Sequence, residues 1–127
     1  MTKSTPTFDD AVKAVNTHLA ERHWENNPPR GLAISIALEA NELLEHYQWQ
    51  DEPIGSTDEI AGELADILIY AIQFAHHYNI DIPESIMTKL AKAAKKYPAD
   101  KFQTTDPAER RVAWLEAKTN HQKDTLL

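Results

Sequence analysis

The sequence predicts an all-α protein, a four-helix bundle with a short additional C-terminal helix. Only three of the 127 residues are glycine, and apolar residues recur throughout at helical spacing. Runs of alternating β-branched residues, which would indicate strands, are missing. The length suits one domain, and we expect residues 1–98 to form its helical core and residues 99–127 a tail of the same domain.

The first two helices are separated by a proline-containing turn. The first should begin near residues 7–9 and run to about Trp24, because the segment 26-NNPPRG-31 follows it. A residue before proline avoids the α region, so this segment stops a helix. We expect the second helix to cover roughly residues 30–48.

The third helix should begin at a capping box. In 56-STDE-59, Ser56 and Glu59 have the spacing at which the hydroxyl and the carboxylate each satisfy a free backbone N–H group. Apolar residues then recur at helical spacing for about twenty positions. The sequence therefore predicts a helix from about Thr57 to Tyr78.

The last two helices have similar start signals. In 81-DIPE-84 the aspartate is a good N-cap and the proline fits a first turn, so a fourth helix should extend to about Lys96. In 106-DPAE-109 the same signals open a short helix to about Lys118. We expect the final residues, 121–127, to fray.

Composition limits the classes of partner. The chain has 20 acidic and 13 basic residues, a net charge of −7, which disfavours non-specific attraction to nucleic acid or anionic lipid. Its longest apolar stretch, 64-LADILIYAIQFA-75, is interrupted by Asp66 and Gln73 and is shorter than the ~18 apolar residues of a membrane span. Without cysteine or a signal segment, a cytoplasmic protein is the expectation.

Acidic residues follow one edge of the third helix. At 100° per residue, Glu59, Glu63 and Asp66 fall within about 60° of one another, with Tyr70 in the same stripe. The apolar residues of this helix centre roughly 100° away. The acids therefore border the packing face, where side chains become partly buried.

The second helix has a matching acidic edge. Glu39 lies at the border of its apolar face, and Glu42 and Trp49 follow on the same side. If the two helices pack antiparallel, these glutamates face Glu63 and Asp66. The sequence then places four carboxylates in one shallow pocket.

Four carboxylates at close range would repel one another, and a hard divalent cation resolves this conflict. Mg²⁺ suits the inventory because it takes oxygen ligands and keeps positions for water and substrate phosphates, whereas Zn²⁺ usually takes His or Cys. Mn²⁺ is expected to substitute. The alternative is a solvated acidic face with i,i+4 ion pairs, but few of these acids have a basic residue at i+4.

Several motifs carry a family resemblance from about Thr7 to Pro98. They are ExxE at 39–42, ExxD at 63–66, 21-ERHW-24, 47-YQW-49, 66-DILIY-70 and 95-KKYP-98. With them the chain resembles the MazG-like superfamily of all-α nucleoside triphosphate pyrophosphatases, and most closely its dCTP pyrophosphatase branch. The two acidic motifs together are more specific than either alone.

The resemblance implies an activity and an assembly. Such proteins are four-helix subunits of dimers or tetramers that bind Mg²⁺ through the ExxE and ExxD carboxylates. They hydrolyse a nucleoside triphosphate, here dCTP or a modified dCTP, to the monophosphate and pyrophosphate, which cleanses the nucleotide pool. By this resemblance the metal ligands are Glu39, Glu42, Glu63 and Asp66.

The resemblance also suggests substrate-binding residues. The branch holds the base in an aromatic cleft, and the matching positions are Trp24, Trp49 and Tyr70, although each ring could instead pack in the core. Lys96 matches the basic residue of the KYP motif and is the first candidate for a phosphate contact. Arg30 near the cleft is another. Lysines in a last helical turn also complement the helix dipole.

Catalysis is assigned to the second helix, and two other functions remain open. Glu39 or Glu42 is expected to orient and deprotonate the water that attacks the α phosphorus. The chain could instead hydrolyse dUTP or phosphoribosyl-ATP, or be a non-catalytic helical module that docks a partner helix through residues 47–49. His46 lies near the acidic edge, where a surface or packing role is favoured over a phosphate contact.

Overall fold

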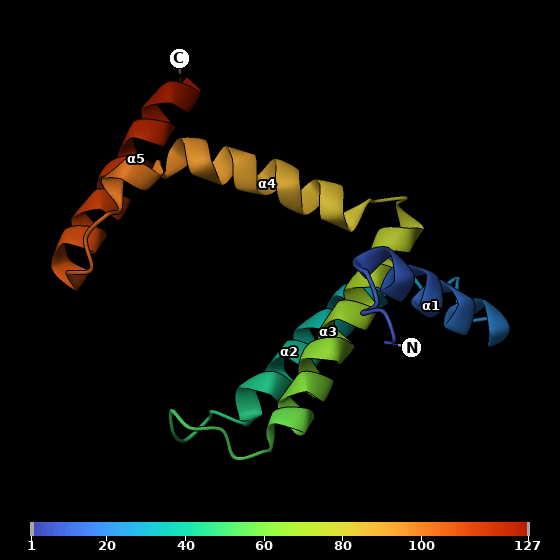
Figure 1. The fold of residues 1–127 in the computed structure, drawn as a ribbon. Coiled ribbons are helices and arrows are strands. Elements are labelled where there is room, and N and C mark those ends of the chain that lie inside the picture. The colour runs from blue at the N-terminus through green and yellow to red at the C-terminus, as the bar shows by residue number, and fades with distance from the viewer. Residues whose placement is uncertain (1, 127) are drawn as a thin grey trace. The chain divides into compact units, whose positions relative to one another are not determined.

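The computed structural model describes residues 2–126, with the backbone alone for residues 123–126, and all regular structure in that range is helical (Figure 1). Its elements are α1 (Phe8–Glu21), α2 (Pro29–Glu45), α3 (Thr57–His77), α4 (Ile82–Lys96), the 3-10 turn η1 (Ala99–Lys101) and α5 (Pro107–Leu126). The predicted all-α fold is confirmed. The described chain divides into two compact units, unit 1 up to Ile82 and unit 2 from Pro83, and each is treated by itself.

Helices α1 and α3 both begin at capping boxes. The hydroxyl of Thr7 accepts a hydrogen bond from the backbone N–H of Asp10 at 3.1 Å, and the Asp10 carboxylate accepts from the N–H of Thr7 at 2.9 Å. At α3 the hydroxyl of Ser56 accepts from the N–H of Glu59 at 3.2 Å, and the Glu59 carboxylate accepts from the N–H of Ser56 at 2.7 Å. Each box satisfies two N–H groups that lack a partner within the helix. Both helices begin where the sequence predicts.

Helix α1 ends three residues earlier than predicted. It stops at Glu21, because His23 adopts a left-handed backbone conformation with φ 56° that a helix cannot continue through. The N–H of Trp24 donates to the carbonyl of Leu19 at 2.9 Å and closes this end. Trp24 therefore lies in the loop after α1.

Helix α2 also ends before its predicted limit. It begins at Pro29, whose fixed φ suits the first helical position, and ends at Glu45 instead of residue 48. The chain turns there: the carbonyl of His46 accepts a hydrogen bond from the N–H of Ile54 at 2.9 Å. This bond closes a loop over residues 46–54 that periodicity alone does not predict.

The core of unit 1 lies at one end of an antiparallel hairpin. Helices α2 and α3 pack side by side and are joined by the 46–56 loop, while α1 packs less extensively on α3 (Figure 1). The buried apolar side chains among the described residues are Leu19, Leu32, Ile72 and Ala75, each at most 6% exposed. They come from the end of α1, the start of α2 and the end of α3. The half of the hairpin nearer to the 46–56 loop is correspondingly more open.

Unit 2 contains α4, η1 and α5, and none of its described side chains is fully buried. Helix α5 is longer than the predicted short helix: it runs for 20 residues to Leu126, past the predicted end near Lys118 and through the segment expected to fray. After Pro107 the segment contains neither proline nor glycine and is rich in strong helix formers, so nothing stops it. Residue 127 lies outside the described range.

No helix in residues 2–126 combines the length and the apolar character needed to cross a bilayer. The division into a core of residues 1–98 and a tail within the same domain stays a prediction.

Candidate metal centre

Helices α2 and α3 bring four carboxylates together in the half of the hairpin nearer to the 46–56 loop. Glu39 and Glu42 come from α2, and Glu63 and Asp66 come from α3. Each offers one oxygen, and these oxygens all lie within 4.8 Å of one another. Residues three apart share a helix face, so antiparallel packing aligns the two pairs. We call these four side chains the carboxylate cluster.

Glu39 is the electrostatically strained member of the cluster. Burial raises the pKa of its carboxyl above the usual range, and the hydrogen bond with Glu42 and the negative charges of Glu42, Asp66 and Glu63 raise it further. Its Oε2 atom is buried without a hydrogen-bond partner in the described part of the chain. A buried acceptor without a partner is costly, and a cation would satisfy it.

The donor set fits a hard divalent cation. All four side chains offer oxygen, the element that Mg²⁺ and Mn²⁺ prefer, and two of them are half-buried while two are exposed. The exposed pair leaves one side of the cluster open to water and to a substrate. The cluster can therefore hold a divalent metal, and the assignment of these residues as its ligands stays a prediction.

One histidine contacts the cluster in a way that sequence reasoning missed. The Nε2 atom of His46 lies 3.5 Å from Oε1 of Glu63, and the two side chains are 15% and 24% exposed. The interpretation of His46 as a surface or packing residue did not include this contact with Glu63. Only part of the signal is present in the sequence: His46 follows Glu39 by seven residues, two helical turns along the same face, which places it near the acidic edge but does not identify Glu63 as its partner.

The three aromatic candidates lie in different surroundings. Trp24 is 54% exposed in the loop after α1, with its ring edge-on to His18 at 6.1 Å, and Trp49 is 82% exposed in the loop after α2. Neither tryptophan packs in the core of unit 1, so the alternative role of core packing is removed for both rings. Tyr70 is half-buried on α3, one turn beyond Asp66. Their assignment to a base cleft stays a prediction.

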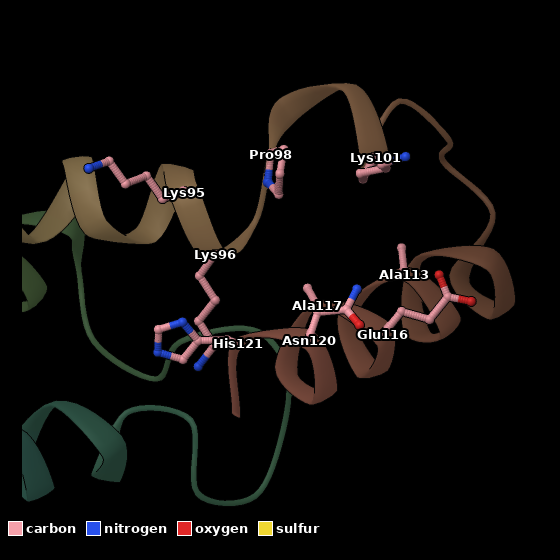
Figure 2. Close-up of a pocket in the computed structure, with 9 residues that line it drawn as sticks. All are labelled: Lys95, Lys96, Pro98, Lys101, Ala113, Glu116, Ala117, Asn120 and His121. Atoms are coloured by element: carbon pink, nitrogen blue, oxygen red, sulfur yellow. The ribbon is translucent and has the colours of Figure 1, made fainter. Parts of the chain in front are cut away.

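The cationic candidates are not both in unit 1. Arg30 is exposed in the first turn of α2. Lys96 belongs to unit 2, where its Nζ lies 5.3 Å from the ring centroid of Tyr97. Lys96 and Lys95 also line a hollow of about 310 Å³, in which Lys96 extends toward His121 of α5 (Figure 2). The predicted contact of Lys96 with a substrate phosphate stays a prediction.

Comparison with known proteins assigns the chain that carries the carboxylate cluster to a family. The model of the MazG-like family matches residues 34–107, more than half of the chain. The chain belongs to the MazG-like family. The matched range contains both acidic motifs, which supports the recognition of this family from those motifs.

Relatives of this MazG-like chain include curated pyrophosphatases. It is 36% identical over 104 residues to dCTP pyrophosphatase 1 from Bos taurus, covering 75% of the chain and 62% of that protein. It is 34% identical over 103 residues to dCTP pyrophosphatase 1 from Homo sapiens, covering 74% of the chain and 61% of that protein. The chain thus spans about three fifths of the length of these curated relatives.

A solved structure extends the likeness to the fold. The chain is similar to a pyrophosphatase from Archaeoglobus fulgidus with a TM-score of 0.62 and 27% sequence identity, covering 77% of this chain and 98% of the other.

The family match includes Trp49, Tyr70 and Lys96 but begins after Trp24 and Arg30. The two N-terminal candidates therefore depend on the motif resemblance and their own geometry.

Proposed function

We propose that this MazG-like chain is a Mg²⁺-dependent nucleoside triphosphate pyrophosphatase that hydrolyses dCTP or a modified dCTP to the monophosphate and pyrophosphate, in the cleansing of nucleotide pools. One observation carries the proposal: four carboxylates from facing helices offer oxygens within 4.8 Å of one another. The names of the curated relatives support dCTP as the substrate.

The carboxylate cluster would hold the metal through Glu39, Glu42, Glu63 and Asp66. Bound there, Mg²⁺ would supply charge neutralisation for the triphosphate oxygens. Burial of the Glu39 carboxyl raises its pKa, and the hydrogen bond with Glu42 and the neighbouring negative charges raise it further, so a cation in the cluster would favour the charged form. An all-oxygen donor set favours Mg²⁺ or Mn²⁺ over Zn²⁺.

The chain's own carboxylates would handle the water. Glu39 or Glu42 would orient a water molecule for in-line attack on the α phosphorus and accept its proton. Glu39 is half-buried and Glu42 is exposed, so the pair extends from the shielded to the open side of the cluster. Pyrophosphate would then leave with Lys96 or Arg30 as its cationic partner.

The exposed tryptophans support the base site. A ring that is largely exposed has a free face on which a base can stack, and such stacking contributes about 1–3 kcal/mol per base. Trp49 is 82% exposed and Trp24 is 54% exposed. Tyr70 is half-buried on α3 one turn from Asp66 and would contribute a further ring to the base site.

A homodimer or homotetramer is part of the proposal. Large apolar side chains are exposed on the hairpin and on α4, including Leu38, Leu64, Leu68, Met87 and Leu90. Residues 1–82 contain 14 acidic and four basic residues, whereas residues 83–127 contain six acidic and nine basic residues. Apolar surface and opposite charge together favour contact between unit 1 of one copy and unit 2 of another. Light scattering coupled to size exclusion measures the number of subunits.

A substrate panel tests the function. Pyrophosphate release from dCTP, 5-methyl-dCTP, dUTP, dATP and ATP is measured with Mg²⁺ and with EDTA. We expect the cytosine nucleotides to be the fastest and EDTA to stop the reaction. Preference for dUTP would assign a different base pocket to the same chemistry, and no turnover of any nucleotide would favour the interaction module.

A further inference from the structure

We propose that His46 is a positioning residue for Glu63: its imidazole holds the Glu63 carboxylate in the orientation in which that group can ligate a divalent cation. The inference rests on the proposed function and deepens it, because it assigns a role to a side chain outside the carboxylate cluster. It also gives a function to the start of the 46–56 loop, which lies outside both acidic motifs.

His46 contacts Glu63 directly. Nε2 of His46 lies 3.5 Å from Oε1 of Glu63, and the same glutamate belongs to the carboxylate cluster. Both side chains are largely shielded, at 15% and 24% exposure. Carboxylates that bind metals are commonly held by a neighbouring polar group, which fixes the direction of their lone pairs. His46 is placed to do this for Glu63.

A backbone hydrogen bond and the close approach of Gly55 hold the imidazole of His46 in place. The backbone of His46 is held at the end of α2 by the hydrogen bond from the Ile54 N–H to its carbonyl, at 2.9 Å. Its ring lies against Gly55: a Cβ atom added there would lie 2.5 Å from Cε1 and 2.6 Å from Nδ1 of the ring. Gly55 does not have a positive φ, so glycine is required for space and not for backbone conformation.

Gly55 also lies close to the start of α3. The same added Cβ at Gly55 would lie 2.6 Å from Oε2 of Glu59, the carboxylate of the capping box. Gly55 therefore lies between the imidazole of His46 and the cap of α3. With Nε2 3.5 Å from Glu63 Oε1 and the Nδ1–Cε1 edge of the ring against Gly55, the histidine spans from the loop to the second turn of α3.

Simple packing gives a different expectation. A side chain that only filled the space over Gly55 could be apolar, whereas a polar nitrogen directed at a metal-binding carboxylate acts through that nitrogen. His46→Leu keeps most of the volume and removes the nitrogen. His46→Gln keeps an amide nitrogen at the end of a flexible side chain. The two variants therefore separate positioning from packing.

The experiment measures Mn²⁺ affinity on the full chain without nucleotide, by the electron paramagnetic resonance signal of free Mn²⁺. We expect His46→Leu to raise Kd by roughly 10- to 100-fold and His46→Gln to recover much of this loss. His76→Leu, at the exposed end of α3, is the matched control and should bind like the wild type. Urea unfolding in EDTA checks that the variants fold.

Gly55→Ala is an independent perturbation if the histidine variants fail to fold. Its methyl group should displace the ring and raise Kd, whereas Gly62→Ala, where an added Cβ meets nothing within 4 Å, should not. Wild-type affinity in His46→Leu, or in Gly55→Ala, would overturn the positioning role while leaving the pyrophosphatase proposal intact. Absence of Mn²⁺ binding by the wild type would overturn both.

Discussion

Glu39 on α2 and Asp66 on α3 offer carboxylate oxygens within 4.8 Å of each other, on helices joined by the 46–56 loop. Apolar packing of the hairpin produces this closeness, because the acids border the packing faces of both helices. The fold thus gains hydrophobic contact at the cost of charge repulsion. A bound divalent cation would offset this repulsion. Four consequences can be measured.

The first prediction concerns Glu39 in the metal-free protein. Its folded-state pKa is raised, so between the usual pKa of glutamate and the raised value the folded state binds more protons than the unfolded state. The stability due to this group is complete below that window and is lost as pH rises through it. The urea midpoint of Glu39→Gln in EDTA should therefore rise relative to that of the wild type as the pH increases, because only the wild type carries the charge that forms on Glu39.

The matched control is Glu45→Gln, an exposed glutamate on α2 outside the carboxylate cluster. It should leave both the midpoint and its pH dependence near those of the wild type. Equal effects of the two substitutions would mean that general loss of negative charge, and not relief inside the cluster, stabilises the variant.

The second prediction concerns metal and stability. A cation that binds only the folded state stabilises it by about 2.7 kcal/mol when present at 100 times its Kd. Mg²⁺ and Mn²⁺ should raise the melting temperature of the wild type in a concentration-dependent way, and EDTA should reverse this. Differential scanning calorimetry measures the change. Identical melting with and without metal would exclude a metal site at the carboxylate cluster.

The features of the fold and of the candidate site that the sequence predicts are those set by short local motifs or by helical periodicity. The Ser56–Glu59 capping box depends on four consecutive residues. The closeness of ExxE and ExxD depends only on helical spacing and antiparallel pairing. The all-α fold follows from the same periodicity. None of these features depends on the path of a loop.

The parts that were missed depend on non-local contacts or on absent signals. The His46–Glu63 contact requires the loop closed by Ile54, which one backbone hydrogen bond sets. Helix α2 ends at Glu45 for the same reason. Helix α5 runs to Leu126 because no residue stops it, and absent stop signals carry less weight in a sequence than present ones.

The third prediction concerns Glu63. Glu63→Gln removes one negative oxygen from the carboxylate cluster and weakens the partner of His46. Pyrophosphate release should fall below detection, while the far-ultraviolet circular dichroism stays near that of the wild type, because the change is isosteric and glutamine is a good helix former. Hydrolysis at the wild-type rate by a folded Glu63→Gln variant would refute the metal assignment.

The last prediction concerns the base site. Trp49 is 82% exposed, so Trp49→Ala removes little packing and should leave the unfolding midpoint unchanged. If its ring stacks on the base, the loss of about 1–3 kcal/mol raises KM for dCTP by roughly 5- to 150-fold. Trp114→Ala is the matched control: this tryptophan lies on α5 in contact with Lys118 and has no assigned role in the reaction. Steady-state kinetics on both variants would separate the two positions. A KM for Trp49→Ala equal to that of the control would place the base on other side chains, with Trp24 the next ring to test, and would leave the metal chemistry of the carboxylate cluster unaffected.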